Sequence, residues 1–567
     1  MESDMSSKIV DSLNIDLKSL DRKSKRGLFS VLLVTMISLV GVEISAASPN
    51  PDEVEIGRKI YMEGVLPSGE LLKGVRQGAV QVEGAQAACE TCHRRSGMGS
   101  LEGNFAVPPI TGRFLFANED DRPLALVDTR QPKDITRAHK PYAESTLSKA
   151  IREGVDVDGK DMNLLMPRYA LNDNEVKAVT TYLRQLSSEL APGVGNDSLH
   201  FATIITQNVK PEKSDVMVKM LKAAFGQRNS SQQTYSGRMR MPLDLIPRQL
   251  RKWELSVWEL KGEPETWAEQ LSEYYRREPV FAVISGVSNG IWSPVSKFCQ
   301  QEKIPCLLPS VALPPDEPSF YSLYYSKGVA LEASVLANHL RAKDKNKPRR
   351  IVQIYRDDEV GRGAVKVLSE ALKDSSVKVE NRIFPEKLSE NLKNIFKGLS
   401  SNDTVMLWLK PTDLVAVNKE NHKQFPRVIY VSGFLAEEDY GFVSKEWKEH
   451  VRVVYPYELG EKRRKNIAGM QQWLKSWSIP LVDQVFQSEV FFDVLLLTDL
   501  SSQMIDNFYR DYIVERAEDM LGIGSNFSAY PHLSLSRGQR FASKGAYIGR
   551  FGSDGKLVAD SEWIVPE

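Results

Sequence analysis

Two stretches in the first third of the chain place apolar residues three or four positions apart, a spacing that predicts amphipathic helices. The first helix is expected over residues 53–61, with Ile56 and Ile60 on one face. The second is expected to begin after Asn172, whose side chain can cap the helix while Glu175, three residues on, completes a capping box. One face of this second helix carries Val176, Val179, Thr180 and Leu183.

From residue 199 onward the pattern changes, because short apolar runs now alternate with helical stretches. Strands are expected at 201–205, 255–258, 280–284 and 306–308, with helices at 215–225, 266–275 and 292–301 between them. A second series has strands at 351–355, 405–409, 428–431 and 451–454 and a helix at 364–372. Alternation of this kind predicts parallel sheets covered on both faces, and two series in tandem predict two lobes.

Composition limits the class of protein. With 567 residues the chain exceeds the usual size of one core, so two or three domains are expected. Lys plus Arg and Asp plus Glu both number 74, so the charge balance gives no support for a nucleic acid partner. Four cysteines in so long a chain exclude a disulfide-stapled scaffold.

The N-terminus has the pattern of an export signal. Basic residues at 22–26 precede an apolar run at 27–42, and small residues follow at 45–48. Cleavage after Ala46 or Ala47 fits a secretory signal peptide over residues 1–47. The alternative is an uncleaved anchor, but the run is short for a ~20-residue span and Glu43 interrupts it. No later stretch is apolar enough to span a membrane, so we expect a periplasmic protein without a membrane span after cleavage.

Cys89, Cys92 and His93 form the Cys-x-x-Cys-His arrangement that attaches a c-type haem. Two thiols on one short turn can add to the two vinyl groups of one porphyrin, while the adjacent imidazole binds the iron. The alternatives are a redox dithiol or half of a zinc site. Zinc needs a second pair of ligands nearby, and Cys299 and Cys306 lie about two hundred residues away.

A second iron ligand is expected from the loop before the capped helix. Met166 is favoured, because the proline that follows it holds the loop extended. Met162 is the nearest competitor, and His139 would give a bis-histidine site. The prolines at 108–109 could supply a carbonyl that accepts the ring N–H of His93, or could form an ordinary turn.

Residues 53–190 resemble a class I cytochrome c, with its first helix, Cys-x-x-Cys-His motif, proline loop, Met-Pro loop and last helix in the same order. We therefore expect a cytochrome c domain over residues 48–190. The resemblance implies an all-α domain around one covalent haem c that exchanges electrons with a periplasmic redox partner. An insertion between Gly64 and Cys89 departs from the family's pattern.

A glycine-rich linker is expected over residues 191–198, and residues 199–567 resemble the type I periplasmic solute-binding proteins of branched-chain amino acid transport. The sequence segments that support this resemblance lie at 284–290, 304–310 and 533–548. It implies a two-lobed α/β domain that binds a small molecule between its lobes. The matching ligand-binding positions are Ser288, Asn289 and Ser310. Asp357 and Asp358 follow a strand, but could simply cap the next helix.

No catalytic constellation stands out, and the sequence predicts an electron carrier that is not itself an enzyme. Two alternatives remain: a haem-containing solute sensor, and the electron-accepting subunit of a periplasmic dehydrogenase. Cys299 and Cys306 are either a disulfide or two buried thiols.

Overall fold

The computed structural model divides into two compact units, Met1–Val54 and Glu55–Glu567, and the sites described below lie in the second. The described residues are 50–76, 79–102, 105–118, 121–122, 139–238, 251–316, 318–341, 348–386, 392, 395–419, 426–520 and 527–566. The predicted signal peptide lies outside them. Among the described residues, no helix has both the length and the apolar character needed to cross a bilayer.

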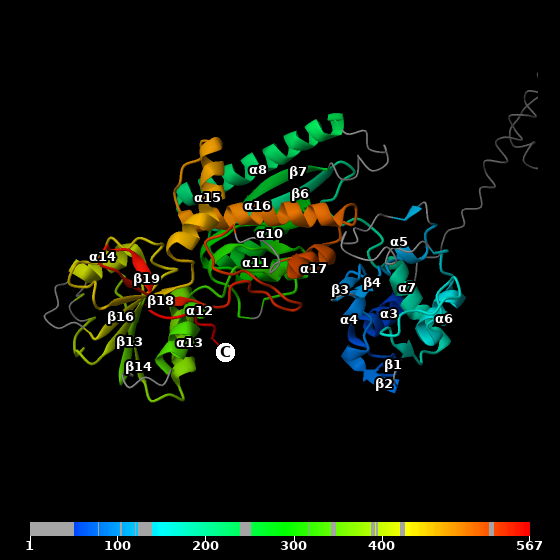
Figure 1. Cartoon of the computed structure of the whole chain (residues 1–567), viewed down its shortest axis with the longest axis horizontal. Coiled ribbons are helices and arrows are strands. Elements are labelled where there is room, and N and C mark those ends of the chain that lie inside the picture. The colour runs from blue at the N-terminus through cyan, green and yellow to red at the C-terminus, as the bar shows by residue number, and fades with distance from the viewer. Residues whose placement is uncertain are drawn as a thin grey trace, which may run out of the picture. The chain divides into compact units, whose positions relative to one another are not determined.

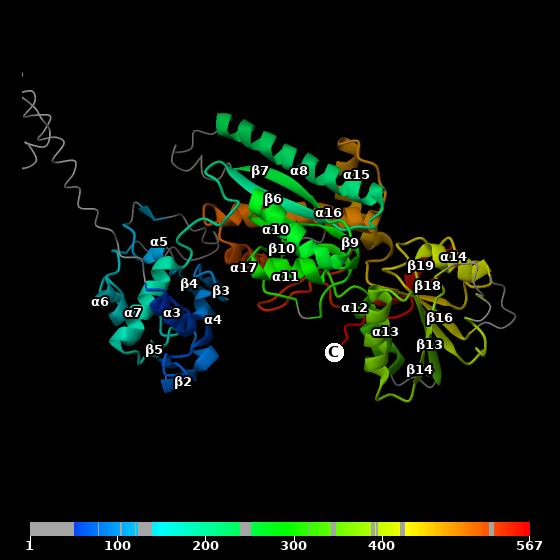
Figure 2. The same cartoon turned by 180° about the vertical axis from the view of Figure 1, so that it is seen from behind.

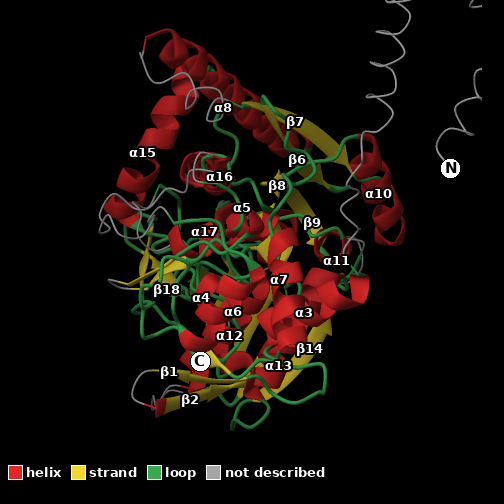
Figure 3. Ribbon diagram, turned by 90° about the vertical axis from the view of Figure 1, so that its right-hand side faces the viewer, coloured by secondary structure: helices red, strands yellow, loops and turns green. Residues whose placement is uncertain are grey.

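The first part of the chain, residues 50–190, is mainly helical and is called the helical part below (Figure 3). Its elements are α3 (Pro51–Glu63), β1 (Lys73–Arg76), β2 (Val80–Glu83), η2 (Gly84–Gln86), α4 (Glu90–His93), β3 (Ser100–Glu102), β4 (Phe105–Val107), α5 (Gly112–Leu115), α6 (Glu144–Glu153), β5 (Arg168–Tyr169) and α7 (Asp173–Gln185).

The two helices predicted from the sequence, α3 and α7, pack against each other. A Cβ on Gly57 of α3 would lie 2.1 Å from the carbonyl oxygen of Ala178 in α7, so only glycine permits this close crossing. One turn further on, the rings of Tyr61 and Tyr182 are 5.3 Å apart. The predicted capping box of α7 is confirmed, because the Asn172 side chain accepts from the Glu175 N–H and Glu175 accepts from the Asn172 N–H.

The predicted all-α character needs one qualification. Among the described residues, β1 pairs antiparallel with both β2 and β5 in a three-stranded sheet, and β3 pairs with β4. Strands β1 and β2 belong to the insertion between Gly64 and Cys89. Its residues alternate too weakly in polarity for a strand pattern, with Val75 and Val80 largely exposed. Each strand of the three-stranded sheet contributes one buried residue, Gly74, Val82 or Tyr169, so backbone pairing together with one narrow buried face forms these strands.

The first lobe contains a parallel sheet. Its elements are β6 (Ser198–Ile205), α8 (Pro211–Arg238), β7 (Lys252–Glu259), η4 (Pro264–Thr266), α10 (Trp267–Arg277), β8 (Ala282–Ile284), β9 (Val287–Ile291), α11 (Ser293–Gln301), β10 (Cys306–Leu307), β11 (Ser310–Leu313) and β12 (Ser322–Leu323). Within the described chain the sheet runs β11-β9-β6-β8-β10-β12, with β7 also on β6. Helices α10 and α11 lie side by side (Figure 2).

The second lobe repeats this plan with α12 (Val329–Arg341), β13 (Arg350–Tyr355), α13 (Glu359–Leu372), β14 (Lys378–Ile383), β15 (Thr404–Trp408), α14 (Pro411–Lys419), β16 (Val428–Ser432), β17 (Val451–Tyr455), β18 (Tyr547–Phe551) and β19 (Leu557–Ala559). Its order in the described residues is β14-β13-β15-β16-β17-β18-β19, parallel up to β17. Helices α12 and α13 lie side by side (Figure 1). The predicted two-lobed α/β arrangement is confirmed.

Between β17 and β18 the chain returns to the first lobe through α15 (Gly460–Ser476), α16 (Gln484–Met504) and α17 (Arg510–Met520). Apolar side chains of α15 and α16 pack with those of α8 in one buried cluster. These crossings tie the two lobes together, and they place α16 beside the carboxyl ends of the strands of the first lobe.

Of the two alternatives for Cys299 and Cys306, the structure has the disulfide, which joins α11 to β10. The bond closes a loop of eight residues. Restriction of the unfolded chain by so short a loop contributes about 2.5 kcal/mol to the free energy of unfolding.

Candidate functional site

The Cys-x-x-Cys-His sequence forms the short helix α4, which begins after Cys89. Cys89 and Cys92 are partly exposed on one turn, and neither is disulfide-bonded. His93 is buried and its Nδ1 lies 3.1 Å from the carbonyl oxygen of Pro108. The predicted proline carbonyl contact is therefore confirmed. Because that carbonyl can only accept, Nδ1 carries the hydrogen and Nε2 keeps its lone pair for a metal.

The protonation of these groups suits ligation. Burial lowers the pKa of His93 to about 4, although the Pro108 carbonyl opposes the shift, so the imidazole is neutral at neutral pH. Burial raises the pKa of the Cys89 thiol to about 12. A neutral imidazole beside two thiols of one turn is the donor set that a covalent haem requires, and these residues fit that group.

The loop that carries Met166 is attached to the same region. Its Met166 N–H donates to Asn163 O at 3.1 Å, and Arg168 donates to carbonyls of this loop. Three residues after Met166, the Tyr169 hydroxyl donates to Ala87 O at 2.8 Å, two residues before Cys89. The assignment of Met166 as iron ligand stays a prediction.

The two competitors for that position are placed differently. Met162 lies in the same loop and its N–H donates to Gly154 O at 2.8 Å. The His139 ring lies 2.7 Å from Lys140 O and contacts the Tyr142 ring. This contact leaves one ring nitrogen of His139 already engaged by the backbone.

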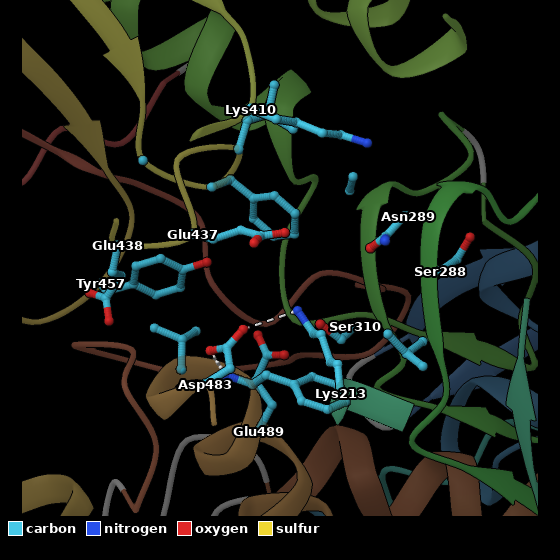
Figure 4. A pocket seen from close by; sticks show the side chains of 17 residues that line it. Lys213, Ser288, Asn289, Ser310, Lys410, Glu437, Glu438, Tyr457, Asp483 and Glu489 are labelled. Atoms are coloured by element: carbon cyan, nitrogen blue, oxygen red, sulfur yellow. Dashed lines mark hydrogen bonds and ion pairs between the residues drawn. The ribbon is translucent and has the colours of Figure 1, made fainter. Parts of the chain in front are cut away.

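A pocket lies where the carboxyl ends of strands from both lobes meet (Figure 4). Parallel doubly-wound sheets bind ligands in this position. Its lining residues belong to β9, β11 and α8, follow β15, β16 and β17, or lie at the start of α16. They are Lys213, Val287, Ser288, Asn289, Ser310, Ala312, Lys410, Gly433, Phe434, Leu435, Glu437, Glu438, Tyr457, Asp483, Val485, Phe486 and Glu489.

The structure brings the three predicted ligand residues Ser288, Asn289 and Ser310 to this pocket. The Ser288 hydroxyl is already engaged within its loop, since it accepts from Thr206 at 3.0 Å and donates to Ile291 O at 3.1 Å. Asn289 donates to Asn208 O at 2.8 Å. Their roles toward a ligand stay predictions.

Asp357 and Asp358 follow β13, and the alternative that they cap the next helix is confirmed for Asp358. The Asp358 side chain accepts from the N–H of Gly361 and caps α13, while Asp357 pairs with Arg362. Neither aspartate lines the pocket.

The pocket is also lined by charged residues that the sequence did not indicate. Lys213 pairs with Asp483 at 3.1 Å, and Figure 4 shows this pair at the side of the pocket opposite Lys410. Glu489 of α16 is 3% exposed. Its Oε1 accepts from the Tyr530 hydroxyl at 2.9 Å, whereas Oε2 makes no hydrogen bond of good geometry within the described chain.

Burial raises the pKa of Glu489 to about 7, and the hydroxyl of Ser310 opposes the shift. A carboxyl group in this state can accept from a ligand's N–H or O–H group or donate to its oxygen. One sequence signal could have found it: Glu489 and Asp493 flank the apolar residues 490–492 in the first half of α16.

Comparison with known proteins gives two family matches. The cytochrome c model matches residues 82–187, and the periplasmic binding protein model matches residues 251–438. A search of curated proteins found no match.

Several solved structures are similar to this chain at low sequence identity. They include a fatty acid ABC transporter substrate-binding protein from Thermomonospora curvata (12% identity, 67% of this chain and 95% of that chain, TM-score 0.48). A leucine-binding protein from Thermotoga maritima is 11% identical over 65% of this chain and 99% of that chain, with a TM-score of 0.46. A branched-chain amino acid binding protein from Streptococcus pneumoniae is 12% identical over 65% of this chain and 100% of that chain, with a TM-score of 0.47.

Proposed function

Because the chain carries a cytochrome c domain over residues 82–187 followed by a periplasmic binding protein domain, we propose that it is an exported electron carrier whose second domain binds a small polar solute. The observation that carries the proposal is the Cys89–His93 helix, in which Pro108 fixes the imidazole and leaves Nε2 free to bind iron. The binding-protein family suggests an extracytoplasmic location.

In this proposal Cys89 and Cys92 hold one haem c through thioether bonds, His93 is its proximal ligand and Met166 its distal ligand. The haem supplies a one-electron couple, and a methionine ligand raises its potential. The chain's own residues would hold these groups in place: the Pro108 carbonyl orients the His93 imidazole, and the Tyr169 hydroxyl bonds to the backbone two residues before Cys89. A redox partner protein in the periplasm exchanges the electron.

In the pocket, the proposed ligand is small and polar. Oε2 of Glu489 provides a buried acceptor for a hydrogen-bond donor of the ligand, and Lys410 provides a cation for an anionic group. An amino acid has both groups. The proposed ligand positions Ser288, Asn289 and Ser310 shape the wall on the side of the first lobe.

Carbon monoxide separates electron transfer from sensing. We expect the purified ferrous protein to show the spectrum of a six-coordinate c-type cytochrome and to leave it unchanged under carbon monoxide, because both axial positions are filled. The measurement is a visible spectrum before and after addition of the gas. Rapid carbon monoxide binding by the unmodified protein would contradict a closed site and favour the haem-containing sensor.

Bulky side chains at the pocket serines should abolish solute binding. In a Ser288→Phe/Ser310→Phe variant, overpacking of the first lobe's wall should weaken binding of any amino acid found in a thermal-shift screen at least about 100-fold, or about 2.8 kcal/mol. The haem spectrum should stay the same. Ser272→Phe, on the exposed face of α10 and outside the pocket, is the matched control. Equal affinity in the double variant and the control would show that the solute binds elsewhere.

A further inference from the structure

The three residues after His93, Arg94-Arg95-Ser96, are called the haem loop here, and they bind to α17 of the binding-protein domain. Glu515 accepts from the Ser96 N–H at 2.9 Å and from the Ser96 hydroxyl at 2.5 Å. Arg94 donates to Glu518 at 2.7 Å. These partners are separated by more than four hundred positions in the sequence.

The contact is buried on both sides. Arg94, Ser96, Glu515 and Glu518 are each less than 9% exposed. Met98, which follows the haem loop, packs in a core cluster with binding-protein residues. On the far side of Glu518, Arg540 donates to it at 2.6 Å. Ion pairs of this kind keep their strength in salt, because water does not screen them.

Glu515 is the member of this cluster whose charge is least compensated. Glu518 has two arginine partners, whereas the hydrogen bonds to Glu515 come from the N–H and hydroxyl of Ser96, which carry no charge. The charged and titratable groups that interact with Glu515 are Arg94 of the haem loop, Tyr61 of α3, and Asp511 and Tyr512 of α17. Further ion pairs of the same cluster involve Arg95, Glu518, Asp519 and Arg540.

We propose that Glu515 couples proton uptake to reduction of the haem iron, so that this protein carries an electron together with a proton. The proposal rests on the haem assigned to Cys89, Cys92 and His93. Ser96 lies three residues beyond His93, which limits their Cα atoms to about 11 Å. Glu515 is thus bonded to a residue close in sequence to the proximal ligand, and Glu515 and His93 are both buried, so a charge at the haem site would act on this carboxyl group with little screening by water.

The direction of the coupling follows from charge. Iron(III) carries one more positive charge than iron(II), so it favours the ionised carboxylate of Glu515. On reduction by a one-electron donor protein, which is itself oxidised, Glu515 would take one proton from solvent and become a neutral carboxylic acid. No other bond forms or breaks. Oxidation returns the electron to an acceptor and the proton to solvent.

The surroundings of Glu515 set the pH range in which it exchanges its proton. Burial raises the pKa of Glu515 to about 8, while Arg94 and the bonds from Ser96 oppose the shift and Asp511 adds to it. The reduced protein binds the proton more tightly than the oxidised protein, so the potential falls as the pH rises between the two pKa values. At pH values outside that interval, Glu515 makes no pH-dependent contribution to the reduction potential.

The test is an optical redox titration of the holoprotein from about pH 6 to about pH 10, across the pKa of Glu515. The reduction equilibrium of the unmodified protein should change by up to tenfold per pH unit, which is about 59 mV for a one-electron couple. Glu515→Gln keeps the shape and can still accept from the Ser96 N–H through its one carbonyl oxygen, but it cannot ionise, so the potential of this variant should stay flat around pH 8. A redox-difference infrared spectrum should lose the carboxyl C=O band of the reduced protein.

Glu332→Gln is the matched control. Glu332 is equally buried, and burial raises its pKa to about 8 as well, but it bonds to Ser432 and Phe434 in the second lobe. This variant should keep the pH dependence of the unmodified protein. A potential in the unmodified protein that does not change with pH overturns the proposal, and this outcome does not depend on how the variant folds. The same change of potential with pH in Glu515→Gln also overturns it. A protein without a c-type haem spectrum contradicts the proposed function instead.

Discussion

Replacing Cys89 and Cys92 by alanine removes all covalently bound haem from the protein. The two thiols of α4 are the proposed attachment points, and without them the porphyrin is held only by weaker axial bonds. After denaturation and acid–acetone extraction, the unmodified protein should keep its haem colour and the double variant should lose it completely. Haem staining of a denaturing gel gives the same measurement.

The other two cysteines provide the control for that experiment. Cys299→Ala/Cys306→Ala removes the disulfide between α11 and β10 and should lower the free energy of unfolding by about 2.5 kcal/mol. It should keep the full amount of covalent haem. If haem colour stayed with the protein in the Cys89/Cys92 variant, the attachment site would be wrong.

Replacing Met166 by alanine should open a coordination position on the iron. Iron(II) loses a soft thioether ligand, so the potential should fall by a few tenths of a volt, within the ~0.8 V range that axial ligands span. The oxidised protein should lose its weak near-infrared sulfur-to-iron band, and the ferrous protein should begin to bind carbon monoxide.

Met162→Ala is the matched control, because it removes a thioether from the same loop. It should keep the band and the potential. If Met166→Ala kept both, the ligand would lie elsewhere, with Met162 and then His139 as the next candidates. A sensing function would then gain support.

Local features of the fold could be read from the sequence because neighbouring residues determine them. Asn172 and Glu175 are three positions apart and form the predicted capping box. The alternation of short strands and helices predicted two α/β lobes, and the pocket contains Ser288, Asn289 and Ser310 where the resemblance placed them. The proline carbonyl on His93 was foreseen as one of two outcomes.

Long-range pairing could not be read in this way. The charges of the pocket come from both lobes and from α16, so Lys213, Lys410 and Glu489 meet only in the folded chain. Likewise, no local pattern connects Ser96 with Glu515. The small sheet of the helical part was missed because its strands are only two to four residues long and each contributes a single buried residue to its inner face.

The disulfide between Cys299 and Cys306 has a consequence for the maturation of this chain. In an oxidising compartment Cys299 and Cys306 form a disulfide. Cys89 and Cys92 would have to be reduced when the proposed haem is attached. Two thiols seven positions apart meet far more often than thiols separated by two hundred. Rapid oxidation of Cys299 and Cys306 removes two thiolates that could otherwise attack a mixed disulfide at Cys89 or Cys92. If Cys89 and Cys92 carry the haem as proposed, the short spacing between Cys299 and Cys306 would limit mispairing between the two cysteine pairs.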